Sequence, residues 1–185
     1  MRIIGGHWRS RVLRFPPIEG LRPTPDRVRE TLFNWLGQDL TGLSVLDLFS
    51  GSGALAFEAL SRGAKLAVAI ETHAEAIHAL RTNAATLGAA SAAPPADAHH
   101  IDIIRSDAIR FLKTDRRLFD VIFIDPPFTE PWWPRLAPLL DARSAVGGWI
   151  YVEQGEPIEP PAGWEVHRQR QAGNVHYHLL RRRDA

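Results

Sequence analysis

The sequence contains no cysteine, which excludes disulfide bonds and thiolate metal sites. No apolar run approaches the length of a transmembrane helix, and residues 1–6 lack the apolar stretch of a signal peptide. The histidines show no spacing that is typical of metal ligands. From these absences we expect a cytoplasmic protein with no membrane partner and no bound metal.

Lysine is scarce too, because arginine supplies twenty of the 22 basic side chains. The net charge is +4 over residues 1–36, −7 over residues 37–165 and +4 over residues 166–185. Basic ends around an acidic middle are typical of a surface that faces nucleic acid. A general preference for arginine explains the same charges equally well, so the charges alone leave both interpretations open.

Short apolar runs alternate with helical stretches from residue 43 onward. Strands that alternate with helices predict a doubly wound α/β domain with right-handed crossovers. The near-continuous apolar run of the fourth strand fits a strand buried on both faces of a parallel sheet. The predicted strands are residues 44–49, 66–70, 101–104, 119–124 and 149–152, and the helices are 54–62, one that ends at Gly88, 108–113 and 133–140.

The end of the chain breaks this alternation. Residues 164–169 and 175–180 are strand-like and flank a turn that contains Gly173, which predicts an antiparallel hairpin. We therefore expect a seven-stranded, mostly parallel sheet with an antiparallel C-terminal hairpin. The Ala/Pro-rich stretch 89–99 predicts a surface loop.

The first 40 residues predict an extension that precedes the main domain of residues 41–185. A small β-hairpin that turns at Gly5 and Gly6 is expected first, and a helix follows it. The sequence predicts Thr24 as the N-cap of this helix and Pro25 as its first residue. The helix then carries an apolar face before Gly37 stops it, and this face consists of Val28, Leu32, Trp35 and Leu36.

The first predicted strand ends at Asp47 and is followed by a glycine loop that contains Gly51 and Gly53. Open α/β sheets bind ligands at the carboxyl ends of their strands. The glycines allow a sharp strand-to-helix turn and a close approach of the backbone to a ligand. We expect Asp47 to accept hydrogen bonds from a ligand ammonium group, and we assign Phe49 to the same site.

Two more acids follow the next two strands. Glu71 can accept hydrogen bonds from both ribose hydroxyls of a nucleoside. Asp107 can bind an adenine amino group while the N–H of Ala108 meets a ring nitrogen. The loop and Glu71 also match a dinucleotide fingerprint, so a nicotinamide-dependent oxidoreductase is an alternative. Asp47 favours S-adenosylmethionine, because a carboxylate attracts the methionine ammonium and repels a pyrophosphate.

The tetrapeptide Asp125-Pro126-Pro127-Phe128 follows the fourth strand and is the most specific signal in the chain. An exocyclic amine on a base is a poor nucleophile, because its lone pair is delocalised into the ring. Asp125 and the carbonyl of Pro126 can accept its two N–H bonds, Pro127 stiffens the turn, and Phe128 offers a ring for stacking. The motif predicts amine methylation but leaves adenine, guanine and glutamine open. Trp132 and Trp133 follow it and fit either a substrate mouth or helix packing.

Together these residues resemble the RsmD family of bacterial 16S rRNA guanine-N2 methyltransferases. The resemblance covers nearly all of the chain, and its most distinctive stretch is Leu21–Leu36. Residues 2–9, 49–55 and 125–128 also fit. The family commonly has Ala where this chain has Ser50, and the insert at residues 89–98 departs from the compact pattern.

The resemblance implies a Rossmann-like class I methyltransferase that transfers a methyl group from S-adenosylmethionine to the N2 amine of one guanine in 16S rRNA. The implied partner is the assembled or nearly assembled small ribosomal subunit, and we expect a monomer. The arginine-rich start is similar to the family's RNA-binding hairpin. The alternatives are adenine-N6 or protein-glutamine methylation, and an RNA-binding factor without catalysis. The residues predicted to bind RNA are Arg9, Arg11, Arg22, Arg27 and Arg29.

Overall fold

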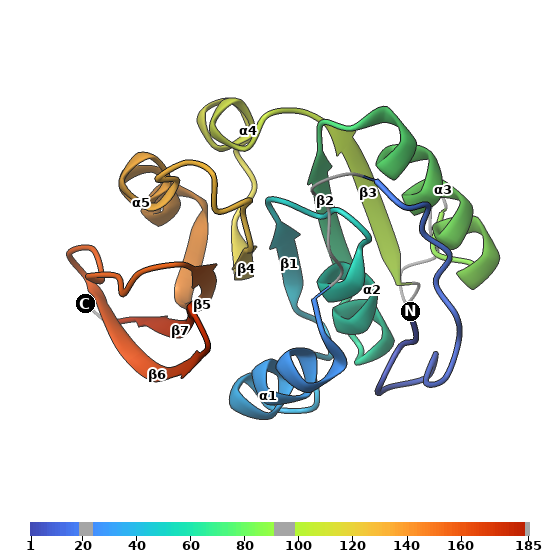
Figure 1. The fold of residues 1–185 in the computed structure, drawn as a ribbon, viewed down its shortest axis with the longest axis horizontal. Coiled ribbons are helices and arrows are strands. Elements are labelled where there is room, and N and C mark those ends of the chain that lie inside the picture. Colours follow the sequence, from blue (N-terminus) through green and yellow to red (C-terminus); the bar gives the residue numbers. More distant parts are fainter. Residues whose placement is uncertain (19–23, 91–98, 184–185) are drawn as a thin grey trace.

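The computed structural model describes residues 1–18, 24–90 and 99–183. Arg22 and most of the 89–98 insert lie outside the described residues. The strands form one seven-stranded sheet in the order β3-β2-β1-β4-β5-β7-β6 (Figure 1). The elements are α1 (Asp26–Leu36), β1 (Ser44–Asp47), α2 (Ala54–Ser61), β2 (Leu66–Glu71), α3 (Ala74–Leu87), β3 (His100–Arg105), α4 (Ala108–Thr114), β4 (Phe119–Ile124), α5 (Trp133–Leu140), the 3-10 helix η1 (Asp141–Arg143), β5 (Ser144–Gln154), β6 (Trp164–Ala172) and β7 (Val175–Arg182).

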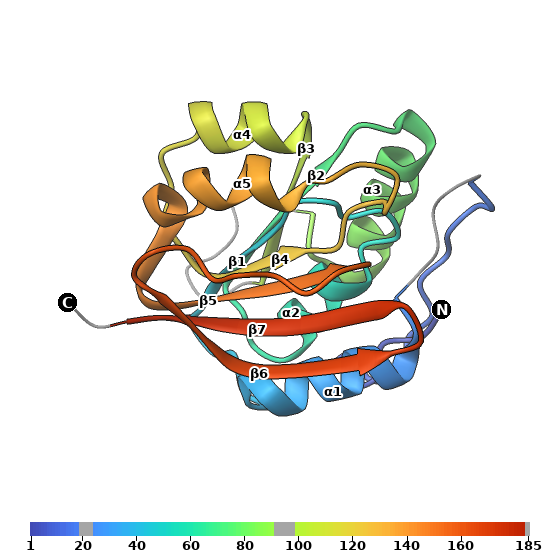
Figure 2. The same ribbon diagram turned by 60° about the vertical axis from the view of Figure 1, so that its left-hand side comes forward.

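The strand pairing confirms the predicted fold class. Strands β1 to β5 pair in parallel, whereas β7 pairs antiparallel with both β5 and β6. Two hydrophobic clusters cover the two faces of the sheet: α1, α2 and α3 contribute to one, and α4 and α5 to the other. Figure 2 shows the helices above and below the sheet, with α1 beneath β6. The doubly wound arrangement brings the carboxyl ends of β1 to β5 to one edge.

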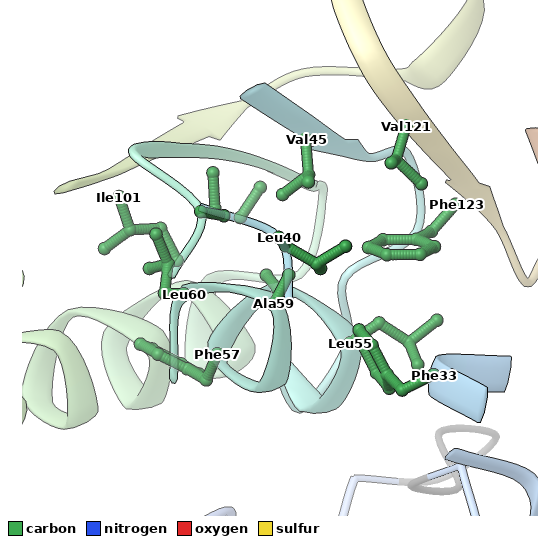
Figure 3. Close-up of a cluster of buried hydrophobic side chains, with 14 of the residues drawn as sticks. Phe33, Leu40, Val45, Leu55, Phe57, Ala59, Leu60, Ile101, Val121 and Phe123 are labelled. Atoms are coloured by element: carbon green, nitrogen blue, oxygen red, sulfur yellow. The ribbon is translucent and has the colours of Figure 1, made fainter. Parts of the chain in front are cut away.

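The N-terminal segment packs into the same core as the sheet. Ile3 and Leu13 are buried in the first cluster, together with Phe33 of α1 and Leu40. Figure 3 shows Phe33 and Leu40 among side chains of β1, α2 and β4. The predicted hairpin is present in a short form: an isolated antiparallel bridge joins Arg2 and Val12, and backbone hydrogen bonds join Ile3 to Ser10 and Arg11 and Met1 to Leu13.

Gly5 and Gly6 lie in the loop between the paired residues Ile3 and Ser10, and this loop packs against α2. Gly6 has φ +72°, and a Cβ built there would lie 1.7 Å from the carbonyl oxygen of Ser61. No larger residue fits so close to a helix backbone. These glycines therefore allow the N-terminal loop to dock on the end of α2, where the amide of His7 donates to that carbonyl at 2.8 Å.

Helix α1 differs from its prediction in two ways. It begins at Asp26, so Pro25 precedes it, and Thr24 does not cap it with its side chain. The buried face centres on Arg29, Leu32 and Phe33. Of the predicted apolar face, Leu32 is buried, whereas Val28, Trp35 and Leu36 are only partly buried.

None of the helices in the described residues is both long enough and apolar enough to cross a membrane. The same residues contain no group of three or more His, Cys, Asp or Glu side chains that could hold a metal ion.

Candidate active site

A cavity of about 670 Å³ opens at the carboxyl ends of β1, β2, β4 and β5. This volume lies within the range of about 300–1,000 Å³ that is typical of small-molecule sites. The structure brings nearly every residue of the predicted catalytic and cofactor sites to this one cavity; only Gly53 is absent from its lining. The predicted residues that line it are Asp47, Phe49, Gly51, Glu71, Asp107, Ala108, Asp125, Pro126, Pro127 and Phe128.

The loop after β1 is held in a sharp turn by its own hydrogen bonds. The hydroxyl of Ser50 donates to the carbonyl of Asp47 at 3.0 Å, and Gly51 and Gly53 both have positive φ, +49° and +77°. A Cβ at Gly53 would lie 2.5 Å from a side-chain carbon of Leu80. Gly53 therefore lets α2 begin close to α3, while Gly51 faces the cavity.

The two predicted nucleoside-binding acids also organise their own loops. Glu71 accepts the amide of Gly51 at 2.8 Å, and its other oxygen accepts the amides of Thr72 and His73 at 2.7 and 2.9 Å. Asp107 caps α4 by accepting the amide of Arg110 at 3.0 Å. A carboxylate offers about four lone-pair positions, so Asp107 keeps acceptor capacity. Glu71 also accepts the hydroxyl of Thr72 at 3.5 Å, so only its oxygen that accepts Gly51 keeps a free position.

The tetrapeptide after β4 lies beside the loop after β1, because β1 and β4 are neighbours in the sheet. Asp125 is partly buried and accepts a hydrogen bond from the hydroxyl of Thr24 at 3.2 Å. Pro126 is buried, whereas the ring of Phe128 is 52 % exposed at the rim. An exposed aromatic ring beside a buried carboxylate can stack on a base whose amine points inward.

Five acidic side chains line the cavity, and among the described residues it has no lysine or arginine in its lining. Burial and the neighbouring Asp125 carboxylate raise the pKa of Asp47 to about 8. Burial also raises the pKa of Asp125 to about 6, although the hydrogen bond from Thr24 opposes this rise. A bound cation would favour the ionised forms of these acids, whereas a pyrophosphate would oppose them, so the cavity suits a cationic ligand.

Sequence reasoning missed several polar residues of this cavity, among them Thr24, Glu153 and Tyr177. Thr24 lies in the distinctive stretch 21–36 but was expected only to cap α1, and Glu153 and Tyr177 belong to no recognisable motif. Burial raises the pKa of Glu153 to about 9, with a further contribution from Asp125, while the hydroxyl of Tyr151 donates to Glu153 at 2.8 Å. The only available signal for Glu153 was its place at the end of a strand that pairs with the Asp125 strand.

The structure separates the roles of the two tryptophans after the tetrapeptide. Trp132 lines the cavity and packs edge-on against Phe49, with ring centroids 5.0 Å apart. Trp133 is buried, and its indole N–H donates to the carbonyl of Glu159 at 3.1 Å. Trp132 therefore belongs to the mouth, and Trp133 belongs to the packing of α5.

The arginines predicted to bind RNA fall into two groups. Arg9, Arg11 and Arg27 are exposed. The prediction for Arg29 was wrong, because its side chain is fully buried and pairs with Glu58 and Asp26. A buried guanidinium with two carboxylate partners has a structural role and cannot reach a phosphate.

Comparison with known proteins agrees with this geometry. The family model described as Conserved hypothetical protein 95 matches residues 1–181. The chain belongs to this family. It is 42 % identical to Ribosomal RNA small subunit methyltransferase D of Escherichia coli over 98 % of this chain and 90 % of that protein, and 38 % identical to the protein of the same name from Haemophilus influenzae, over 97 % and 92 %. The solved structure of yhhF from Escherichia coli superimposes with a TM-score of 0.85 at 41 % identity, over 100 % of this chain and 99 % of that one.

The chain is therefore a methyltransferase, and S-adenosylmethionine is its methyl donor. The cavity fits this molecule, which carries a sulfonium and an ammonium, because its wall is acidic and holds no lysine or arginine from the described residues. Asp47 would hold the ammonium, Glu71 the ribose, and Asp107 with Ala108 the adenine. When bound, the sulfonium supplies an activated methyl group.

We expect the carboxylate of Asp47 to lower the stability of the ligand-free protein and to strengthen cofactor binding. Because its pKa is about 8 in the folded protein and its ordinary value is 3.8, the unfolded chain ionises first as the pH rises. The stability of the ligand-free protein therefore falls as the pH rises from about 4 to 8. We expect Asp47→Asn to raise the Tm of the ligand-free protein at pH 8 and to weaken cofactor binding about 10- to 100-fold, as expected when a charged hydrogen-bond partner is lost.

Thermal unfolding with and without S-adenosylmethionine, at pH 6 and pH 8, measures both effects. Glu75→Gln is a matched control, because Glu75 is exposed on α3. If Asp47→Asn is stabilised by the cofactor as strongly as the native chain, Asp47 does not hold the ammonium.

Proposed function

We propose that this chain transfers a methyl group from S-adenosylmethionine to the exocyclic N2 amine of a guanine in 16S rRNA. The observation that carries the proposal is the position of Asp125 and Pro126, which face the same cavity as the cofactor residues, with Phe128 at its rim. The names of the bacterial relatives support rRNA of the small subunit as the substrate. The choice of guanine N2 rests on the resemblance of residues 21–36.

The chemistry follows from the groups at this wall. A carboxylate at Asp125 and the carbonyl of Pro126 accept the two N–H bonds of the amine and turn its lone pair toward the methyl group. Methyl transfer then leaves a positive charge on the nitrogen, and the nearby carboxylate stabilises it and can take the proton. Placement of the amine in line with the transferred methyl supplies most of the rate enhancement.

The substrate context is part of the proposal. Bases in RNA loops can be splayed out into a pocket. This suits a site in which the hydrogen-bond acceptors for the amine lie below the protein surface. We propose that the protein acts as a cytoplasmic monomer on a largely assembled small subunit, since one chain supplies the whole cavity.

The experiment that tests this function is mass spectrometry of small-subunit rRNA from a strain that lacks the protein. One N2-methylguanine should be missing, and purified protein with labelled S-adenosylmethionine should restore it in isolated subunits. Labelled N6-methyladenine in place of N2-methylguanine would favour the adenine alternative, and no transfer to RNA would reject both.

The exposed arginines of the N-terminal segment give a prediction for RNA affinity. We expect Arg9→Ala and Arg11→Ala to weaken RNA binding across sequences, because each removes a phosphate contact. Each lost contact should reduce the magnitude of the negative slope of log K against log salt by about one unit. Titrations at several salt concentrations measure this slope, and Arg183→Ala, at the opposite basic end, is the control. Unchanged slopes in both variants would place the RNA surface elsewhere.

A further inference from the structure

A second, smaller cavity of about 160 Å³ lies between α1 and the β6–β7 hairpin. In Figure 2 the helix runs beneath these strands. The cavity belongs neither to the cofactor site nor to the Asp125 motif. Its lining consists of Arg27, Val28, Thr31, Leu32, Trp35, Tyr151, Arg170, Ala172 and Tyr177.

The floor of this cavity is apolar and aromatic. Val28 and Trp35 belong to the predicted apolar face of α1, and both are partly exposed and line this space. An engineered apolar cavity of about 150 Å³ holds one benzene ring, so this volume suits a single planar ring. The cavity is too small for a whole cofactor.

Its rim is basic. Arg27 on α1 and Arg170 on β6 are exposed and flank the cavity, and no acidic side chain from the described residues lines it. Neither guanidinium makes an ion pair within the described part of the chain. A ring-sized apolar floor below two free guanidinium groups is complementary to a base and its phosphates.

The second cavity adjoins the first through one side chain. Tyr177 lines both cavities, and the buried Tyr151 below it donates its hydroxyl hydrogen bond to Glu153 of the first cavity. Tyr177 lines the first cavity together with Asp125 and Glu153. Burial raises the pKa of Tyr177, and these two carboxylates raise it further. An occupant of the second cavity would therefore lie next to the base whose amine faces Asp125.

We propose that the second cavity binds the base of a nucleotide adjacent to the methylated guanine, with Tyr177 between the two bases and Arg27 and Arg170 on the phosphates. The proposal rests on the proposed function for its substrate, single-stranded RNA. Splayed bases stack on aromatic rings and on guanidinium planes. An apolar protein side chain could fill the floor, but it would leave both guanidinium groups without an anionic partner.

The test combines a protein variant whose second cavity is filled with RNAs that lack one base. Hairpin RNAs carry the target guanine with an abasic residue on its 5′ side, on its 3′ side, or on neither side. For the native protein, one of the two abasic RNAs should bind about 5- to 150-fold more weakly, the range expected for one stacked base. Ala172→Tyr, which places a ring in the cavity, should weaken binding of the intact RNA to a similar extent and show no further loss with that abasic RNA.

Matched controls separate an effect of the second cavity from a general loss of positive charge. Arg170→Ala should weaken RNA binding, whereas Arg168→Ala, two residues along the same strand and outside both linings, should not. Unchanged binding by Ala172→Tyr, or equal abasic losses in native and filled proteins, would overturn the proposal. A defect seen only with assembled subunits would instead show that a ribosomal protein occupies the cavity.

The readouts keep this proposal distinct from the proposed function. RNA affinity is measured without turnover, so a protein that methylates a different amine can still show the abasic effect. Native-like Tm and S-adenosylmethionine binding by Ala172→Tyr show that the variant is folded. If methyl transfer to N2 is absent but the abasic effect is present, only the proposed function fails.

Discussion

Asp125→Ala should lower kcat for methyl transfer about 100- to 1,000-fold, the cost of losing one preorganised group that acts on the transition state. Asp125 contacts Thr24 and follows β4, which β1 separates from β2 and β3, the strands that Glu71 ends and Asp107 follows. The variant should therefore bind S-adenosylmethionine within a few-fold of the native affinity. The variant should be defective in methyl transfer itself, because the amine must then be held and the positive charge that develops on it must be stabilised.

Radiolabel transfer to small subunits, together with calorimetric binding of the cofactor, measures the two effects separately. Glu130→Gln is a matched control, because Glu130 is exposed in the following loop and pairs with Arg135. The native rate should fall as the pH drops below about 6, since the pKa of Asp125 is about 6 and protonation removes an acceptor. Full activity of Asp125→Ala, or a rate that holds to pH 4.5, would contradict the proposed role of Asp125.

The cofactor side of the site could be predicted because it follows from one rule of topology. Consecutive parallel strands end at the same edge of a doubly wound sheet, so Asp47, Glu71 and Asp107 had to meet there. The position of Glu153 in the site could not be predicted in this way. It depends on the pairing of β5 with β4, which places the end of β5 beside Asp125. That neighbour relation follows from the strand order, which the sequence pattern leaves open.

Thr24 shows a second limit. Its side chain was expected to cap α1, which is a local interaction, but it donates to Asp125, 101 positions away. A capping motif can be recognised within four residues, whereas a contact across the chain depends on how the N-terminal segment packs on the sheet. The motif before α1 therefore predicted the helix correctly and the hydrogen bond wrongly.

Arg29 shows the same limit for charge. An arginine in a basic segment is expected at the surface, because charged side chains are almost never fully buried unless they are paired. Its partner Glu58 lies on α2, which is otherwise apolar, and the sequence of this helix does not predict the pairing. Only the packing of α1 against α2 converts a surface charge into a buried one.

Glu58→Ala should lower the free energy of unfolding by about 3–5 kcal/mol, the range for removing one partner of a buried ion pair. The carboxylate of Glu58 is fully buried and accepts from Arg29 at 3.2 Å and from Arg62 at 2.8 Å. It also accepts the backbone amides of Ile4 and Gly5 at 2.9 and 2.8 Å. Without it, two guanidinium groups and two amides lose a shared acceptor inside the protein.

Urea unfolding of the native chain, Glu58→Ala and Glu58→Gln measures the loss. Glu58→Gln keeps the shape and one acceptor oxygen, so it should unfold between the other two and remain measurable if Glu58→Ala does not fold. Glu165→Ala is the control, because Glu165 and Arg183 form an exposed pair at 3.6 Å, and such pairs contribute about 0–1 kcal/mol. A loss below 1 kcal/mol in both Glu58 variants would show that the N-terminal loop, α1 and α2 are held together by apolar packing alone.

The same carboxylate links stability to the active site. Glu58 joins the N-terminal loop to α2 through the amides of Ile4 and Gly5, and it holds α1 through Arg29. Thr24 precedes α1 and orients Asp125, so a shift of this helix would alter the carboxylate that faces the amine. In Glu58→Gln we therefore expect kcat to fall while cofactor affinity is retained, since the cofactor residues after β1, β2 and β3 are held by their own loops.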